Sequence, residues 1–136
     1  MRLFIFALCT CSLIGCAQEP PPPPLIEIDL STLNEEASTL ILSKSKNATT
    51  GSEWKELGML YQAHDLVEPA IVAYSYSLEL ESDPQSWYLL AISQAGLGDY
   101  EKAIVTMSHV TGYLPAEWNQ GFWHLDLGSN ELALEH

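Results

Sequence analysis

The sequence predicts an all-α protein built from antiparallel helix pairs, and three observations support this prediction. The stretch WKELGMLY, residues 54–61, places Trp, Leu, Gly and Tyr at offsets of zero, three, four and seven. At 3.6 residues per turn these side chains share one helix face, and the Gly lets a neighbouring helix come close. A similar arrangement returns 33 residues later at Trp87, and turn signals such as Gly96-Leu97-Gly98-Asp99 separate the helical stretches.

The chain has room for one small domain with appendages. It has 136 residues, of which 47% are apolar and 17% charged, a globular rather than a disordered composition. A single hydrophobic core is therefore expected.

Residues 1–15 are predicted to be a signal peptide. Their apolar run is too short for a transmembrane helix, which needs about 20 residues. Leu13-Ile14-Gly15-Cys16 resembles the lipobox of bacterial lipoproteins, which implies cleavage before Cys16 and acylation of its thiol. The resemblance implies anchoring at the periplasmic face of the outer membrane, because Ala17 rather than Asp follows the cysteine. An ordinary secretory signal cut nearby is the alternative.

Residues 16–31 are predicted to form a proline-rich linker behind the anchor. Pro20 to Pro24 favour polyproline II, a stiff rod of roughly 15 Å at about 3.1 Å per residue. We interpret this run as a spacer. The alternative is a ligand for proline-binding modules.

Six helices are expected after this linker. Thr32-Leu33-Asn34-Glu35 has the form of a capping box and predicts a capping helix over 32–46. Pro84 and Pro115 suit the first turn of a helix, where the missing N–H has no cost. Further helices are expected at about 53–63, 67–80, 84–95, 99–111 and 115–126.

Residues 53–136 resemble the tetratricopeptide repeat, a helix-turn-helix unit of about 34 residues. The first copy matches its W-x2-L-G-x2-Y pattern and the following Ala and aromatic, while Ser77 stands where Ala is usual. The second copy has Ala91 for the Gly and Gln94 for the Tyr. The third copy is partial, with spacings that differ by one residue, so the resemblance implies about two and a half repeats. It assigns a packing role to Trp54, Leu57, Gly58, Tyr61, Ala70, Tyr74, Trp87, Leu90, Ala91, Ala103 and Pro115.

The resemblance also implies a groove lined by the first helix of each repeat. Its register gives as groove-facing candidates Lys55, Met59, Gln62, Tyr88, Ile92, Ala95, Asn119, Trp123 and Asp126. Family members that clamp a partner's terminal carboxylate use Lys, Arg and Asn. Lys55 could be one member of such a set, but Met59 replaces the expected amide and the other copies offer no cation. A largely neutral groove suits apolar side chains of a helix or an extended segment. The alternative is that Tyr88, Ile92 and Trp123 pack within the protein.

The charge of the chain argues against nucleic acid as a partner. Beyond Cys16 there are 18 carboxylates against four lysines, a net charge of −14, which repels phosphate backbones. We find no spacing typical of metal ligands, no nucleophile with a base and no phosphate-binding loop, so we expect no cofactor, no metal and no catalysis.

These observations predict a non-catalytic adaptor or assembly factor that is anchored to the membrane through Cys16 and binds a protein partner in the groove. One alternative is a self-associating structural protein whose open last repeat, with Trp118 and Phe122, forms a homodimer. Another alternative is a regulatory subunit of an envelope enzyme.

Overall fold

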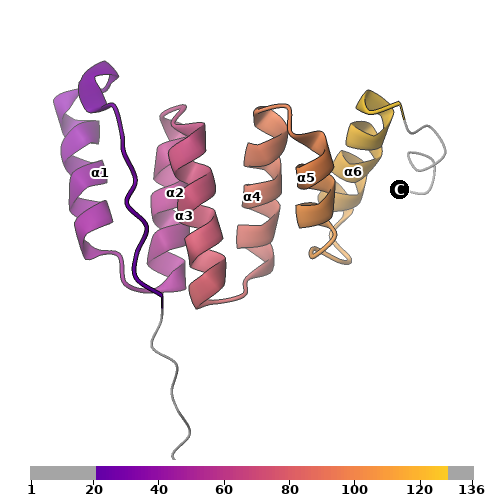
Figure 1. Cartoon of the computed structure of the whole chain (residues 1–136), viewed down its shortest axis with the longest axis horizontal. Coiled ribbons are helices and arrows are strands. Elements are labelled where there is room, and N and C mark those ends of the chain that lie inside the picture. Colours follow the sequence, from indigo (N-terminus) through magenta and orange to yellow (C-terminus); the bar gives the residue numbers. More distant parts are fainter. Residues whose placement is uncertain (1–20, 129–136) are drawn as a thin grey trace, which may run out of the picture.

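The computed structural model describes residues 21–128, and this part of the chain is all-α, as predicted (Figure 1). Its elements are a 3-10 turn η1 (Leu30–Thr32) and the helices α1 (Glu35–Asn47), α2 (Gly51–Ala63), α3 (Val67–Leu80), α4 (Pro84–Gly96), α5 (Tyr100–Met107) and α6 (Leu114–Asp126). Residues 1–20 and 129–136 lie outside the described residues. The predicted signal peptide, Cys16 and the end of the predicted third repeat fall there.

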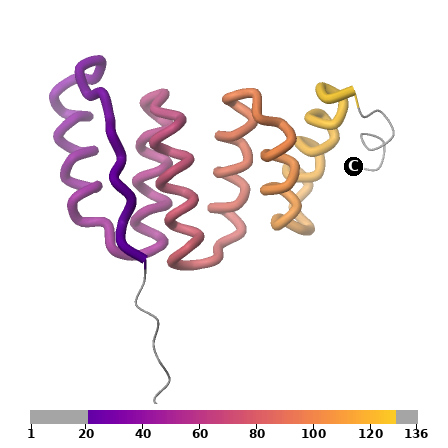
Figure 2. Tube along the Cα trace, viewed as in Figure 1, coloured from indigo at the N-terminus to yellow at the C-terminus, as the bar shows by residue number. Residues whose placement is uncertain are grey.

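The helices stand side by side in chain order, each packed against the next (Figures 1 and 2). The pairs α2–α3 and α4–α5 pack most extensively. The buried side chains form two adjoining clusters, one on α1, α2 and α3 that reaches Leu90, and one from Ala91 to Trp123 on α4, α5 and α6.

Hydrogen bonds at the helix starts set two of the boundaries. The capping box expected at Thr32 is wrong, because residues 30–32 form the 3-10 turn and Asn34 caps α1 by accepting from the Ala37 N–H at 2.8 Å. A capping box does form at the start of α2, between Thr50 and Glu53. The Glu53 carboxylate accepts from the backbone N–H groups of Thr49 and Thr50, at 2.8 and 3.0 Å, and these bonds lower its pKa to about 2.

Gly58 makes room for an aromatic ring. Tyr74 of α3 is fully buried, and a Cβ added at Gly58 would lie 2.5 Å from its ring. The Tyr74 hydroxyl donates to Gln62 Oε1 at 2.9 Å. At Gly51, by contrast, the backbones of two helices come close. A Cβ added there would lie 3.0 Å from the Ser77 carbonyl oxygen of α3.

Most residues given a packing role by the sequence are buried, but two are not. Trp87 is half-buried, with its ring stacked on His109 at a centroid distance of 4.1 Å. Pro115 is exposed, because it lies in the first turn of α6 rather than between helices. The others are buried: Trp54, Leu57, Gly58, Tyr61, Ala70, Tyr74, Leu90, Ala91 and Ala103.

Residues 21–30, which we call the N-terminal strap, pack on the helices and do not form a free spacer. Ile26 and Ile28 are two residues apart in the extended segment, so they point to one side, and together with Leu30 at the start of η1 they pack against the first cluster. At the far end of the strap, the Tyr76 hydroxyl of α3 donates to the Pro21 carbonyl oxygen. The strap runs along α1 beside the α2–α3 pair (Figure 1). The described part of the predicted linker, residues 21–31, is therefore part of the folded domain.

Candidate protein-interaction surface

On α2, two of the three groove candidates are bonded within the chain. The Lys55 ammonium donates to Asp83 Oδ2 at 3.0 Å, and Gln62 accepts from Tyr74. Met59 is 44% exposed and is the only one of the three that offers free apolar surface. The positive charge of Lys55 is thus already neutralised by a carboxylate of this chain.

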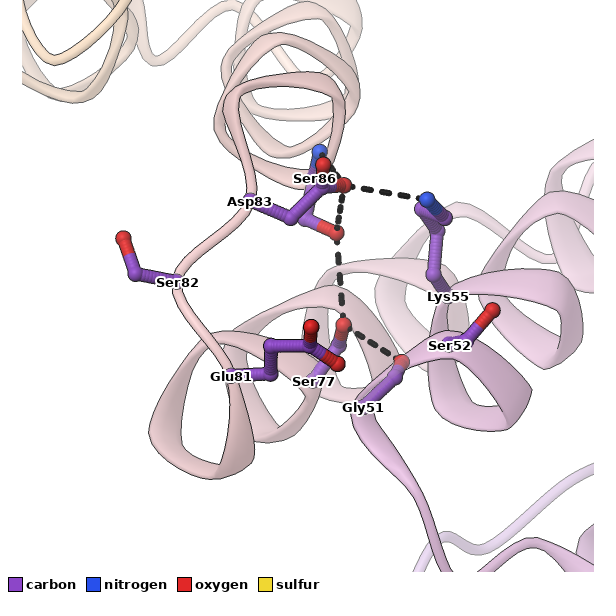
Figure 3. A pocket seen from close by; sticks show the side chains of 8 residues that line it. All are labelled: Gly51, Ser52, Lys55, Ser77, Glu81, Ser82, Asp83 and Ser86. Carbon is purple, nitrogen blue, oxygen red and sulfur yellow. Dashed lines mark hydrogen bonds and ion pairs between the residues drawn. The ribbon is translucent and has the colours of Figure 1, made fainter.

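A polar network joins the ends of α2, α3 and α4 around a cavity of about 150 Å³ (Figure 3). The Ser77 hydroxyl donates to the Gly51 carbonyl oxygen at 2.7 Å and lies 3.3 Å from the Ser86 hydroxyl. Asp83 Oδ2 accepts from the Ser86 hydroxyl and the Ser86 N–H, both at 2.9 Å, and from Lys55. Ser77, which departs from the repeat pattern, therefore bonds to both neighbouring helices.

Asp83 is the centre of this network and also the N-cap of α4. Partial burial raises its pKa, but the hydrogen bonds and charge of Lys55 and the bonds from Ser86 outweigh this effect, so the net pKa lies below the usual value. A carboxyl with a lowered pKa stabilises the folded state above its unfolded pKa, and this stabilisation is lost as the pH falls through the lowered pKa.

We expect Asp83→Ala to reduce the free energy of unfolding by about 1.5 kcal/mol at pH 7, because it removes a helix cap and leaves Lys55 without its partner. The difference from the wild type should shrink as the pH falls below about 4, where the wild-type carboxyl becomes protonated. Urea denaturation at pH 7 and pH 3 measures both effects.

Asp99→Ala is the matched control for that measurement. Asp99 also caps a helix and pairs with a lysine, but its bond to the Lys102 N–H is 3.4 Å and both charged side chains are more exposed. A smaller loss, about 0.5 kcal/mol, is expected. Equal losses for the two variants would show that the network around Asp83 adds nothing beyond an ordinary cap.

On α4, Tyr88 and Ile92 are half-buried and pack against the second cluster. The ring of Tyr88 meets that of Tyr113 edge-on at 5.3 Å, and Asn119 of α6 donates to the Tyr88 hydroxyl at 3.3 Å. Beside these rings lies an open cavity of about 450 Å³, whose lining consists of Pro84, Gln85, Tyr88, Leu89, Val110, Thr111 and Tyr113. Tyr88 thus has a packing role and also faces an apolar hollow.

On α6, the predicted register is wrong by one residue. The helices α2, α4 and α6 all have 13 residues, and each is followed two positions later by a residue with positive φ: Asp65, Gly98 and Gly128. These helices start at Gly51, Pro84 and Leu114. The first two starts are therefore 33 residues apart, and the last two are 30 residues apart.

With this alignment, the α6 counterparts of Tyr88, Ile92 and Ala95 are Trp118, Phe122 and Leu125. Trp123, proposed for the groove, is 7% exposed and belongs to the second cluster. Asn119 is half-buried beside Tyr88, and Asp126 is exposed at the end of α6. The repeat shortens because α5 stops at Met107 instead of 111. The N–H groups of His109 and Val110 bond three residues back, and Gly112 takes a φ of 69°.

Within residues 21–128, no group of three or more His, Cys, Asp or Glu side chains is placed to hold a metal ion. No helix of the described part has the length and apolar character needed to cross a membrane.

The chain matches no protein-family model and no curated protein. The surface described above therefore has to be interpreted from its own residues.

Proposed function

We propose that this protein is an envelope lipoprotein of the tetratricopeptide-repeat type that acts as a protein-binding adaptor. The proposal is supported by the close packing of α2 on α3 around the motif residues, with Gly58 placed under the ring of Tyr74. The observation that carries the binding role is the apolar surface left on this scaffold: Met59 on α2 and the hollow beside Tyr88 and Tyr113. A partner segment with apolar side chains fits such a surface.

The anchor in this proposal is an acylated Cys16. Acyl chains hold a protein on a membrane at about 0.8 kcal/mol per buried methylene, and stable anchoring takes more than one chain. Because the hydrogen bond from Tyr76 holds the strap at Pro21, only four residues lie between the strap and Cys16, and the five Cα–Cα steps give a reach of at most about 18 Å. The helices would then lie close to the lipid headgroups of the outer membrane, with little freedom to move away.

The test is a pull-down from detergent-solubilised envelopes with the full-length protein as bait, read by mass spectrometry. The comparison is a Met59→Glu/Tyr88→Glu variant, which places charges on the apolar surface, with Val72→Glu/Val105→Glu as the matched control at exposed apolar positions on α3 and α5. We expect a partner that is captured by the wild type and the control but at least about tenfold less by the groove variant. The same partner recovered equally with all three baits would rule out the groove.

Further experiments check that the variants are folded and test the anchor separately from the adaptor role. Thermal melts show whether the groove variant is folded, and Met59→Glu alone avoids disturbing the contact between Tyr88 and Tyr113. Cys16→Ser is expected to abolish the incorporation of a labelled fatty acid into the protein. If the label is still incorporated, the lipid anchor at Cys16 is wrong while the adaptor role stands.

A further inference from the structure

The outer face of α6 carries a stripe of large apolar side chains. Trp118, Phe122 and Leu125 are 60%, 57% and 50% exposed, and Leu114, one turn before Trp118, is 63% exposed. The rings of Trp118 and Phe122 lie 6.3 Å apart. We call these four residues the α6 stripe. Single exposed apolar residues are ordinary on a protein surface, but a continuous helical stripe with two aromatic rings marks a contact surface.

The other two helices of the same type show what covers such a stripe. On α4 the equivalent residues, Tyr88, Ile92 and Ala95, are half-buried and pack against the cluster that includes Ala116 and Trp123 of α6. On α2 the equivalent Lys55 reaches the N-cap of α4. On α4 the covering residues come from both α5 and α6, whereas on α2 the equivalent Met59 stays 44% exposed. The α6 stripe therefore has the position and side-chain types of a surface that receives another α-helix.

The charges near the stripe favour a basic helix over a second copy of this chain. Glu117 and Asp126 lie on α6 itself, one residue from Trp118 and Leu125. The only lysine between residues 97 and 128, Lys102, is already paired with Asp99 at 3.1 Å. Two copies of α6 packed together would bring like charges close to each other, whereas Lys or Arg beside the apolar face of a partner helix would pair with them.

We propose that the α6 stripe binds an amphipathic helix of another protein, one whose apolar face is flanked by basic residues. This rests on the proposed adaptor role and deepens it, because the stripe occupies on α6 the positions that the groove candidates Met59 and Tyr88 belong to on α2 and α4. The incoming helix would place its apolar face against the outer face of α6. Its apolar residues would cover Trp118 and Phe122, and its cations would face Glu117 and Asp126.

The test uses two synthetic peptides of about 18 residues, or about five helical turns, with leucines on one face and either lysines or glutamates on the rest. Binding of each labelled peptide to the full chain is followed by fluorescence anisotropy at fixed salt and detergent. We expect the lysine peptide to bind at least about tenfold more tightly than the glutamate peptide. We also expect Trp118→Glu/Phe122→Glu to weaken the lysine peptide at least about tenfold, since truncated or charged aromatic anchors dominate such losses.

The sign of the variant's effect separates a specific site from simple charge attraction. The protein is acidic, so a basic peptide held only by net charge would bind the more acidic Trp118→Glu/Phe122→Glu variant more tightly, not less. Val72→Glu/Val105→Glu adds the same two charges elsewhere and should change the affinity by less than about twofold. Because Trp118 and Phe122 are more than half exposed, glutamate at these positions should leave the fold intact, and a thermal melt of each variant checks this.

Three outcomes would overturn the proposal. Equal binding of both peptides would show that basic residues on the partner helix are not needed for binding. A dimer in sedimentation experiments that is lost in Trp118→Glu/Phe122→Glu would make a second copy the occupant. Binding that appears only after removal of residues 129–136 would make that segment of the chain the occupant. If the α6 stripe fails while the pull-down with the Met59 and Tyr88 variants still identifies a partner, only the binding role of α6 is lost. If both fail, the adaptor role itself is wrong.

Discussion

Gly58→Ala is expected to reduce the free energy of unfolding by about 3 kcal/mol, although alanine is the better helix former by about 1 kcal/mol. The added Cβ would lie 2.5 and 2.6 Å from ring atoms of Tyr74, distances that real contacts do not reach. Tyr74 is fully buried and its hydroxyl is held by Gln62, so the ring cannot move aside without disturbing α2 and α3 together. Urea denaturation followed by circular dichroism measures the loss.

Gly96→Ala is the matched control, since Gly96 is also a helical glycine but a Cβ there would meet nothing within 4 Å. It should be neutral or stabilising by about 0.5 kcal/mol. A double-mutant cycle tests the cause. In a Tyr74→Leu background the ring is gone, so Gly58→Ala should cost much less than in the wild type. If the cost is the same in both backgrounds, the clash with Tyr74 is not the reason for the glycine.

The packing inside the first helix pair could be predicted from the sequence because it is local. The offsets of Trp54, Leu57 and Tyr61 fix one face of α2, and a following helix of the same kind can cover that face in few ways. The two ends of α4 were also predictable to within one residue, because Pro84 and the turn glycine Gly98 act on the backbone next to them. Val67–Leu80 was expected and found residue for residue.

What could not be predicted depends on distances along the chain that no local pattern fixes. The early end of α5 at Met107 shifts the register of α6 by one residue, so Trp123 turns inward and Trp118 outward. The sequence does contain a signal for the strap, but the proline content of the segment obscures it. In IEIDL, residues 26–30, apolar and acidic residues alternate, which is the pattern of an extended segment with one buried side. Its five neighbouring prolines favoured a spacer instead.

The contact made by the strap leads to the second large expected effect. Ile26→Ser/Ile28→Ser should reduce the free energy of unfolding by about 3 kcal/mol, because both side chains pack on the cluster that contains Trp54 and Tyr76.

Leu25→Ser is the control for that variant. Leu25 is adjacent in sequence but fully exposed, so its loss should stay within about 0.5 kcal/mol. Chemical denaturation of the three proteins under identical conditions decides between two views of residues 21–30. Equal stability of all three proteins would show that residues 21–30 act as a free spacer, and the tether between Cys16 and the helices would then be longer. A loss confined to the isoleucine variant would mean that the first helix pair relies on the strap to cover its outer face, as α3 relies on α4 on the other side. A partner that displaced the strap would then have to provide comparable apolar contacts of its own.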